Sequence, residues 1–241
     1  MSSRSLIAKF AHLRRGLPLI AAALLLVAIV VPVWRITLTA PQYPSQILLI
    51  EVYAYPRLGG DFVEVAGLNK YVGFYYPDPV YMDPNYPIHE GAIEVPEWIL
   101  GPIALVAVAA AGVFVSLAPT VRKLKLGLTA QLVGTATTFT AMFVLIQYRL
   151  YQAGHSLDPD APLSGVEGFT PPVLGGYEVA NISGFAWFGP GGYLGIIALV
   201  LLVAAFLLRD SKATFKDLPH LLESLPAATR ARVASVWGEH Q

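Results

Sequence analysis

The sequence predicts an all-α integral membrane protein with four transmembrane helices, both termini in the cytoplasm and two structured extracytoplasmic loops. Three observations support this fold class. Of the 241 residues, 55% are hydrophobic and only 13% are charged, which is about half the charged share of an average soluble domain. Four apolar stretches each hold about 18 or more uncharged residues, enough to cross the hydrocarbon core of a bilayer as a helix. The remaining charges are separated by sign along the chain.

Each apolar stretch is expected to be a helix. The stretches occupy residues 16–34, 98–121, 126–148 and 179–208, and because their apolar residues are continuous rather than alternating, a transmembrane barrel is excluded. The predicted division of the chain is a cytoplasmic amphipathic segment (1–16), spans at 17–38, 97–121, 126–149 and 190–208, extracytoplasmic loops at 39–96 and 150–189, a cytoplasmic loop (122–125) and a cytoplasmic amphipathic tail (209–241).

The first stretch is preceded by basic residues, so a cleaved signal peptide is the alternative to a retained span. Its apolar core, Leu17 to Trp34, is longer than the 7–15 residues of a signal peptide. The only suitable small-residue cleavage site, Thr39-Ala40, stands directly before Pro41. We therefore expect this segment to remain as a membrane anchor.

The charges predict the orientation. The two terminal segments and the loop between the second and third spans hold 12 basic and 4 acidic residues, a net charge of +8, whereas the two long loops have a net charge of −8. Basic residues are enriched on the cytoplasmic side of membrane proteins. The chain is therefore expected to be a multi-pass protein of the cytoplasmic (inner) membrane with both termini inside.

The first long loop is rich in tyrosine and proline. Residues Gln46 to Tyr53 predict a short β-strand, so a small structured domain is expected here. Tyrosines at this level are typical either of the interfacial aromatic belt or of a protein-docking surface. Both interpretations stay open for the candidate docking or structural residues Tyr43 and Tyr71.

Candidate metal ligands in the long loops are few: His89, Met82, His155 and several carboxylates. His155 and Asp158 are the predicted metal ligands, with copper as the metal, because they would share a helical face or flank one turn. In the alternative, His155 holds the loop by hydrogen bonding and Asp158 forms a turn before Pro159.

The third span is the most polar, and Arg149 stands at its outer end. Arg149 is expected to pair with an acid such as Glu97 or Asp158, and Arg35 has the matching position at the end of the first span. A permease would use Gln131 and Gln147, but no span has an ionisable residue near its middle, where transport sites usually have one. A stripe of small residues predicts close packing of this span against the second: Gly127, Ala130, Gly134, Thr138 and Ala141.

Several functions are excluded by what the sequence lacks. Without cysteine there is no disulfide, iron–sulfur cluster or covalently attached haem. No span contains the histidine that a membrane b-type haem needs, and no phosphate-binding or hydrolase motif occurs. We therefore assign no catalytic or cofactor-binding residue, and we expect no enzyme. A formal net charge of zero also argues against a nucleic-acid partner.

Three stretches carry a resemblance to a known family. They are Trp34-Arg35-Ile36 followed by Ala40-Pro41-Gln42-Tyr43-Pro44; Gly67-Leu68-Asn69-Lys70-Tyr71-Val72-Gly73-Phe74; and Gly154-His155-Ser156-Leu157-Asp158-Pro159-Asp160-Ala161-Pro162 with Phe169-Thr170-Pro171-Pro172 and Ala180-Asn181. From about residue 34 to 192 the chain resembles the NosB-like polytopic membrane proteins encoded in nitrous oxide reductase (nos) gene clusters. Lys70 and Phe74 depart from the family pattern, which has histidine and methionine there. This departure counts against copper binding in the first loop.

The resemblance implies an accessory role in denitrification. The leading hypothesis is a non-enzymatic membrane accessory protein that assists the maturation of an extracytoplasmic copper reductase or its electron supply. The expected partners are membrane lipid and other membrane or extracytoplasmic subunits, including a copper reductase or cytochrome. The alternatives are a structural subunit of a multi-subunit membrane respiratory complex and, third, a transporter.

Overall fold

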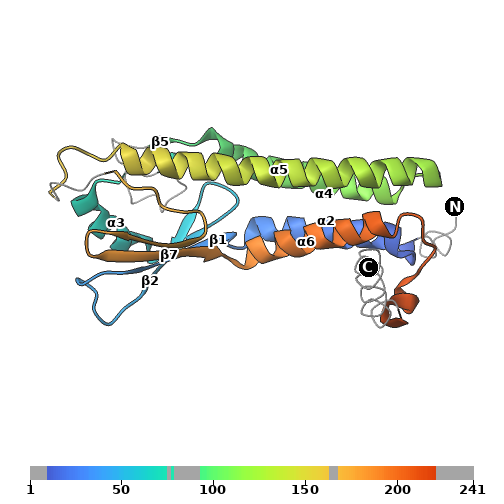
Figure 1. Cartoon of the computed structure of the whole chain (residues 1–241), viewed down its shortest axis with the longest axis horizontal. Helices are drawn as coiled ribbons and strands as arrows, with labels where there is room; N and C mark the ends of the chain where they lie inside the picture. Colours follow the sequence, from blue (N-terminus) through green and yellow to red (C-terminus); the bar gives the residue numbers. More distant parts are fainter. Residues whose placement is uncertain (1–9, 75–76, 79–92, 163–167, 221–241) are drawn as a thin grey trace, which may run out of the picture.

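The computed structural model describes residues 10–74, 77–78, 93–162 and 168–220. Four long helices lie side by side along the length of the molecule (Figure 1): α2 (Leu13–Val30), α4 (Pro96–Ser116), α5 (Val121–His155) and α6 (Pro190–Leu207). All four are long and apolar enough to cross a membrane. The chain is therefore a multi-pass membrane protein, as predicted.

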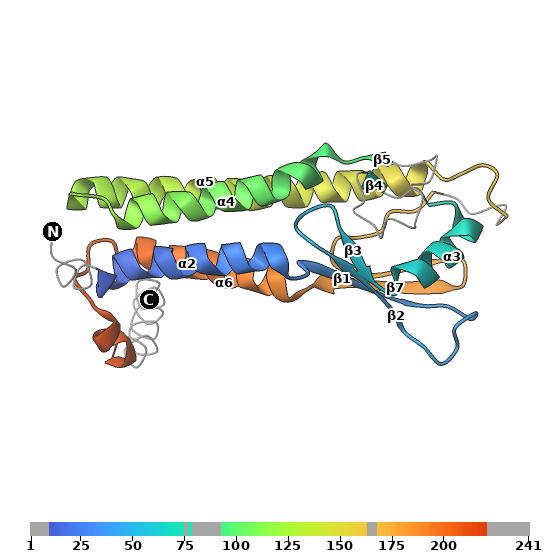
Figure 2. The same cartoon turned by 180° about the vertical axis from the view of Figure 1, so that it is seen from behind.

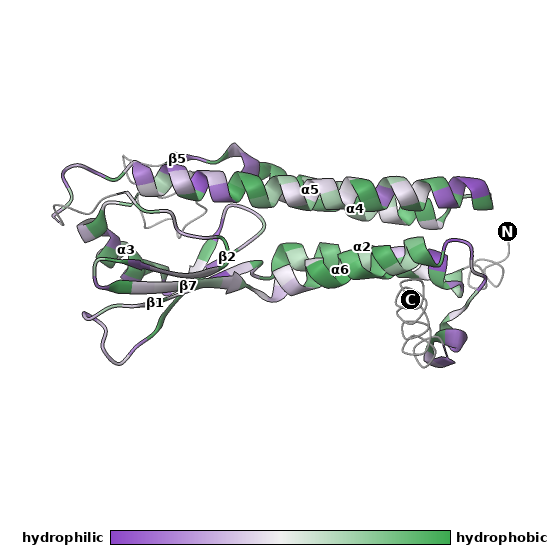
Figure 3. Cartoon of the chain, viewed as in Figure 1, coloured by the Kyte–Doolittle hydropathy of each residue, from purple (hydrophilic) through white to green (hydrophobic). Residues whose placement is uncertain are grey.

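The bundle is held together by small and branched apolar residues. Helix α2 packs against α6 and α4, and α5 packs against α4 and α6. The buried core includes Ala22 and Leu25 of α2, Leu105 of α4, and Ala198 and Leu202 of α6; the alanines let the helix backbones approach closely. Figure 3 shows α2 and α6 hydrophobic over most of their length and α5 hydrophilic at both ends. Large apolar side chains are exposed on all four helices, as expected of surfaces in lipid.

The bundle is all-α, as predicted, and outside it both long loops contribute strands to one antiparallel sheet, whereas short strands were expected in the first loop alone. The strands are β1 (Trp34–Thr39), β2 (Leu48–Val52), β3 (Leu58–Gly60), β6 (Gly175–Val179) and β7 (Ile182–Phe188), in the order β3-β2-β1-β7-β6. Strand β2 confirms the strand predicted at Gln46 to Tyr53. Strand β1 pairs with β2 on one side and with β7 on the other, so strands far apart in sequence meet at the centre of the sheet.

One face of this sheet is covered by helix α3 (Phe62–Val72). Leu38, Leu48 and Ile50 from the sheet pack against Phe62 and Leu68 of α3. Figures 1 and 2 show α3 between the sheet and the outer part of α5. Within the described part of the chain, no helix covers the opposite face of the sheet, which we call the open face.

The first predicted span, 17–38, is too long at its C-terminal end. Helix α2 ends at Val30, and strand β1 begins at Trp34. Pro32 between them cannot donate a backbone hydrogen bond and restricts the residue before it. The β-branched residues that follow favour a strand once a partner strand is available, and the sequence alone did not show that β7 supplies this partner.

The third span also differs from the prediction. Residues 122–125, predicted as a loop, are helical, because α5 runs from Val121 to His155. Its 35 residues give a length of about 52 Å, well beyond the roughly 30 Å of hydrocarbon. The last turns of α5 therefore lie in the region predicted as the second loop, 150–189. The bounds of α6 differ from the predicted 190–208 by one residue.

Three short elements complete the described chain. Strand β4 (Pro77–Asp78) pairs in parallel with β5 (Ile93–Glu94), and a 3₁₀ turn, η1, spans Phe215–Asp217. The segment before η1 is tied to the start of α2: Leu13 N donates to Ala213 O at 3.0 Å. The amphipathic character predicted for 1–16 and 209–241 rests largely on residues outside the described ranges.

Candidate functional site

A shallow concave surface lies at the end of the sheet farthest from the bundle. A groove of about 400 Å³ is formed by the β1–β2 loop and the start of β7. Its lining carries no charged side chain and includes the predicted docking residue Tyr43: Thr39, Ala40, Pro41, Tyr43, Pro44, Ser45, Gln46, Ile47, Asn181 and Ser183. Thr39 is directly opposite Ser183 in the sheet. The groove therefore depends on the two loops being joined.

The turn beside the groove is strained. Ala180, between β6 and β7, has a φ of 54° and is the one residue other than glycine with positive φ among the described residues. A Cβ in this conformation costs roughly 1–2 kcal/mol. Strain of this kind is often retained at binding sites, so the turn adds to the case for the groove.

The second predicted docking tyrosine is elsewhere. Tyr71 lies at the C-terminal end of α3, is half exposed and does not line the groove. The structure thus separates Tyr43 and Tyr71, which the sequence analysis had placed in one tyrosine-rich loop.

The two predicted metal ligands make local contacts. His155 is the last residue of α5; its Nδ1 lies 2.9 Å from Tyr151 O, and its ring stacks on that of Tyr151 at 4.1 Å. Asp158 accepts a hydrogen bond from Asp160 N at 2.9 Å, which forms a turn across Pro159. Both contacts are those of the structural alternative. No group of three or more potential ligand side chains occurs within the described ranges, and His89 and Met82 lie outside them.

The two predicted arginines both form ion pairs. Arg149 Nη2 lies 2.7 Å from Glu97 Oε1, as predicted, and ties α5 to the first turn of α4. Arg35 pairs with Glu51 on the neighbouring strand, also at 2.7 Å. Trp98 adds a hydrogen bond from its indole nitrogen to Tyr53 O. The Trp98 hydrogen bond joins α4 to the end of β2, whereas the two ion pairs lie within the bundle and within the sheet.

Gln147, which a permease would use, holds the second loop instead. Its Nε2 donates to Pro171 O at 3.2 Å and its Oε1 accepts from Val173 N at 3.0 Å. Gln147 lies about 39 Å along α5 from Val121. A residue at that distance is beyond a hydrocarbon core of about 30 Å that begins near the start of α5.

Polar residues do occur inside the bundle, at a few places. Gln131 and Thr135 of α5 are more than nine-tenths buried, and their side-chain oxygens have no hydrogen-bond partner within the described part of the chain. Ser116 Oγ, also buried, contacts the carbonyl oxygens of Arg15 and Gly112 at 2.9 and 2.8 Å. A buried polar group in a membrane is costly, so Gln131 is the residue on which the transport hypothesis still depends.

The small-residue stripe of α5 does not pack as predicted. Gly127 does contact Val115 of α4, but a Cβ added at Gly134 would meet no atom within 4 Å, and Ala130, Gly134 and Ala141 are exposed. The contact of α4 with α5 uses Gly112 and Gln131 instead. Most of the stripe is therefore an outward-facing surface.

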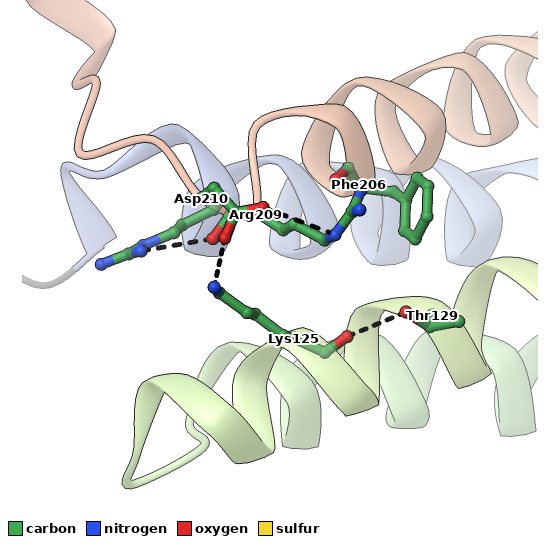
Figure 4. Close-up of polar contacts among 6 residues, drawn as sticks. Lys125, Thr129, Phe206, Arg209 and Asp210 are labelled. Carbon is green, nitrogen blue, oxygen red and sulfur yellow. Dashed lines mark hydrogen bonds and ion pairs between the residues drawn. The ribbon is translucent and has the colours of Figure 1, made fainter.

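The opposite end of the bundle is strongly basic, and we call it the basic end: Arg14, Arg15, Arg122, Lys123, Lys125, Arg209, Lys212 and Lys216. Figure 4 shows Lys125 paired with Asp210, and Arg209 donating to Phe206 O at 3.0 Å. The ammonium group of Lys125 lowers the pKa of Asp210. Hydrogen bonds from the backbone and hydroxyl of Thr214 lower that of Asp217. Arg15 donates to Ser116 O and Ala118 O at the end of α4.

Two features of the site were missed at the sequence level. Residues 182–188 were included in the apolar stretch of the fourth span, although their alternation of exposed and buried residues is that of a strand. Asn181 and Ser183 belong to a glycosylation sequon, Asn181-Ile182-Ser183, and this short motif does not indicate that they line a groove. The signal available in the sequence was the group of strand-favouring aromatic residues, Phe185, Trp187 and Phe188, directly before Gly189 and Pro190.

Comparisons of the chain with protein-family models, curated proteins and solved structures give no match. Its function is therefore argued from the geometry of the groove, the sheet and the bundle.

Proposed function

We propose that this chain is a non-enzymatic membrane accessory protein whose sheet docks a partner outside the cytoplasmic membrane. The observation that carries the proposal is the construction of the groove: two loops about 140 residues apart in the sequence are joined as neighbouring strands to form it. Strand β1 follows α2 after three residues, and β7 precedes α6 after one. A sheet held this closely by two membrane helices presents its far end at a constant height above the bilayer.

The chemistry of the partner follows from the groove and from the resemblance. The lining is uncharged and contains tyrosine, proline and isoleucine, which suits a protein surface rather than a charged small molecule. The NosB-like motifs direct the proposal to the nitrous oxide reductase system, so the proposed role is copper-site maturation of that reductase or its electron supply. For copper handling, His155 and Asp158 are the proposed metal contacts, beside the structural contacts that each of them makes.

A matched pair of variants tests the docking role. Ile47 lines the groove and is 67% exposed, and Val63 is 49% exposed on α3; neither is needed for the core. Deleting the gene is expected to lower the copper content and activity of the reductase without changing its transcription. Ile47→Lys should reproduce the loss at normal membrane abundance, while Val63→Lys should restore activity. A deletion strain with normal copper loading and full activity contradicts the proposal.

The proposed orientation places the groove outside and the basic end in the cytoplasm. It follows from the excess of basic residues at the basic end. Because the chain contains no cysteine, single cysteines can report it directly. A membrane-impermeant maleimide added to intact cells should label Gln46→Cys and leave Lys123→Cys unlabelled until the membrane is opened. The reverse labelling would invert the orientation.

A structural subunit of a respiratory membrane complex is the second candidate, favoured by the outward-facing stripe on α5. Small residues on a lipid-facing helix allow a neighbouring helix to approach closely. In that case the chain should co-purify in fixed ratio with a cytochrome or quinol-oxidising subunit in mild detergent. Gly134→Leu should release that subunit, whereas Val133→Leu, at an already bulky exposed position, should not.

A further inference from the structure

Large aromatic side chains are exposed where β7 enters α6. Phe185, Trp187 and Tyr193 are 50%, 44% and 48% exposed. Phe185 and Trp187 alternate with the buried residues Gly184 and Ala186, so both lie on the open face of the sheet, opposite α3. We call these three residues the aromatic ladder.

The aromatic ladder is an ordered array. The rings of Phe185 and Trp187 stack with their centroids 5.9 Å apart and their planes 15° apart. The indole nitrogen of Trp187 donates to the hydroxyl of Tyr193 at 2.7 Å, and the ring of Tyr193 meets that of Phe188 edge to face. These contacts connect the last strand of the sheet to the first turn of a membrane helix.

The joint between β7 and α6 is also held in place. Gly189 N donates to Val33 O at 3.0 Å and Gly191 N donates to Pro32 O at 2.8 Å. A side chain at Gly189 would collide with the backbone of Pro32, so the absence of a Cβ lets the two connections pack together. The aromatic ladder therefore keeps one position relative to the helices.

The length of α6 places the aromatic ladder at the membrane boundary. Helix α6 has 18 residues, or about 27 Å, which is close to the roughly 30 Å of hydrocarbon in a typical bilayer, and Arg209 follows two residues after its end. With Arg209 at one boundary, the other falls at Pro190. The hydroxyl of Tyr193 and the indole of Trp187 then lie at the head-group layer, which is roughly 5–7 Å deep.

The lipid-facing surface of α6 runs directly into the aromatic ladder. Ile197, Val200 and Leu207 are exposed and follow Tyr193 at helical spacing. The aromatic ladder is thus continuous with the lipid-contacting surface of the bundle. Rings that combine an apolar body with a hydrogen-bonding edge favour this layer.

We propose that Trp187 and Tyr193, with Phe185 stacked on the outer side of Trp187, form an anchor that binds the head-group layer of the phospholipid bilayer and sets the depth of the bundle. Arg35, in register with Trp187 on β1, is already paired with Glu51. This neutral pair gives no preference for anionic lipid, so the anchor binds zwitterionic head groups. The anchor also assigns this part of the open sheet face to lipid and leaves the groove for a protein.

Depth-dependent fluorescence quenching tests the anchor. The chain has four tryptophans, and a variant with Trp34→Phe, Trp98→Phe and Trp237→Phe retains Trp187 alone. It is reconstituted into phosphatidylcholine vesicles that carry bromine either near the head groups or deep in the acyl chains. We expect several-fold stronger quenching by the shallow bromines, and the same quenching after phosphatidylglycerol is added.

A matched reporter and a fold check complete the experiment. With Trp187→Phe added to the same background, Tyr43→Trp places the single tryptophan in the groove, where neither lipid should quench it. Circular dichroism is used to check that each variant is folded. If the triple variant does not fold, Trp187→Phe is made in the natural chain instead, where it should remove the quenching by the shallow bromines. Quenching of Trp187 no stronger than that of the groove reporter overturns the proposal. Stronger quenching by the deep bromines overturns it as well.

Discussion

Replacing Gln147 with leucine is expected to detach the second loop from α5. Leucine is similar in size but removes both hydrogen bonds, to Pro171 O at 3.2 Å and from Val173 N at 3.0 Å. Val173 is 6% exposed, so its N–H loses a partner in a place where water has little access. Each unpaired buried group costs about 1–3 kcal/mol, which gives a total loss of about 2–4 kcal/mol when the loop relaxes partly.

Hydrogen exchange at the Val173 amide measures this loss. A cost of about 2 kcal/mol corresponds to roughly 30-fold faster exchange, because 1.4 kcal/mol is a factor of ten. Gln147→Glu is the matched control: it keeps an acceptor for Val173 N–H and loses only the donor to Pro171, so a smaller acceleration is expected. An exchange rate in Gln147→Leu that matches the natural chain would refute the assigned hydrogen bond.

The hydrogen bonds of Gln147 to the second loop make Gln147→Leu unsuitable for testing transport. Lost flux in Gln147→Leu would reflect a displaced loop rather than a blocked path. Gln131→Leu is the informative variant, since Gln131 lies inside the bundle; unchanged flux in that variant would remove the transport hypothesis.

Two further predictions concern the sheet. Ala180→Gly should raise the unfolding free energy by about 0.5–1 kcal/mol, because the relief of positive-φ strain exceeds the added chain entropy of glycine. The control Ala186→Gly, in an extended and buried position, should lower the unfolding free energy. A lower thermal midpoint in both variants would contradict the strain at Ala180. Burial raises the pKa of Tyr177 to about 12, so the folded state stays protonated where the unfolded chain ionises near pH 10. The contribution of Tyr177 to the free energy of unfolding is therefore fully present below pH 10 and should fall by about 3 kcal/mol as the pH rises to about 12. Tyr177→Phe should remove this contribution, which a circular dichroism titration measures.

The contacts that could be predicted from the sequence were a local turn and a pairing between the ends of neighbouring spans. Arg149 was expected to pair with Glu97 or Asp158, and it pairs with Glu97. The turn at Asp158 was the alternative to a metal-ligand role and followed from the proline after it. Tyr43 was singled out, but Asn181 and Ser183 were not joined to it. Their proximity to Tyr43 depends on the pairing of β1 with β7, which involves residues almost 150 positions apart and has no local signature.

The sequence by itself determined the four membrane helices, because the cost of exposing backbone and charge to hydrocarbon is paid residue by residue and can be read from a local window. It also determined the separation of charge from which the orientation is predicted. The tertiary structure decided that the C-terminal end of the first predicted span is a strand, that the two loops form one sheet, and that most small residues of the α5 stripe face away from the bundle. These outcomes depend on which surfaces meet, and strand pairing and burial are properties of the whole fold rather than of any single segment.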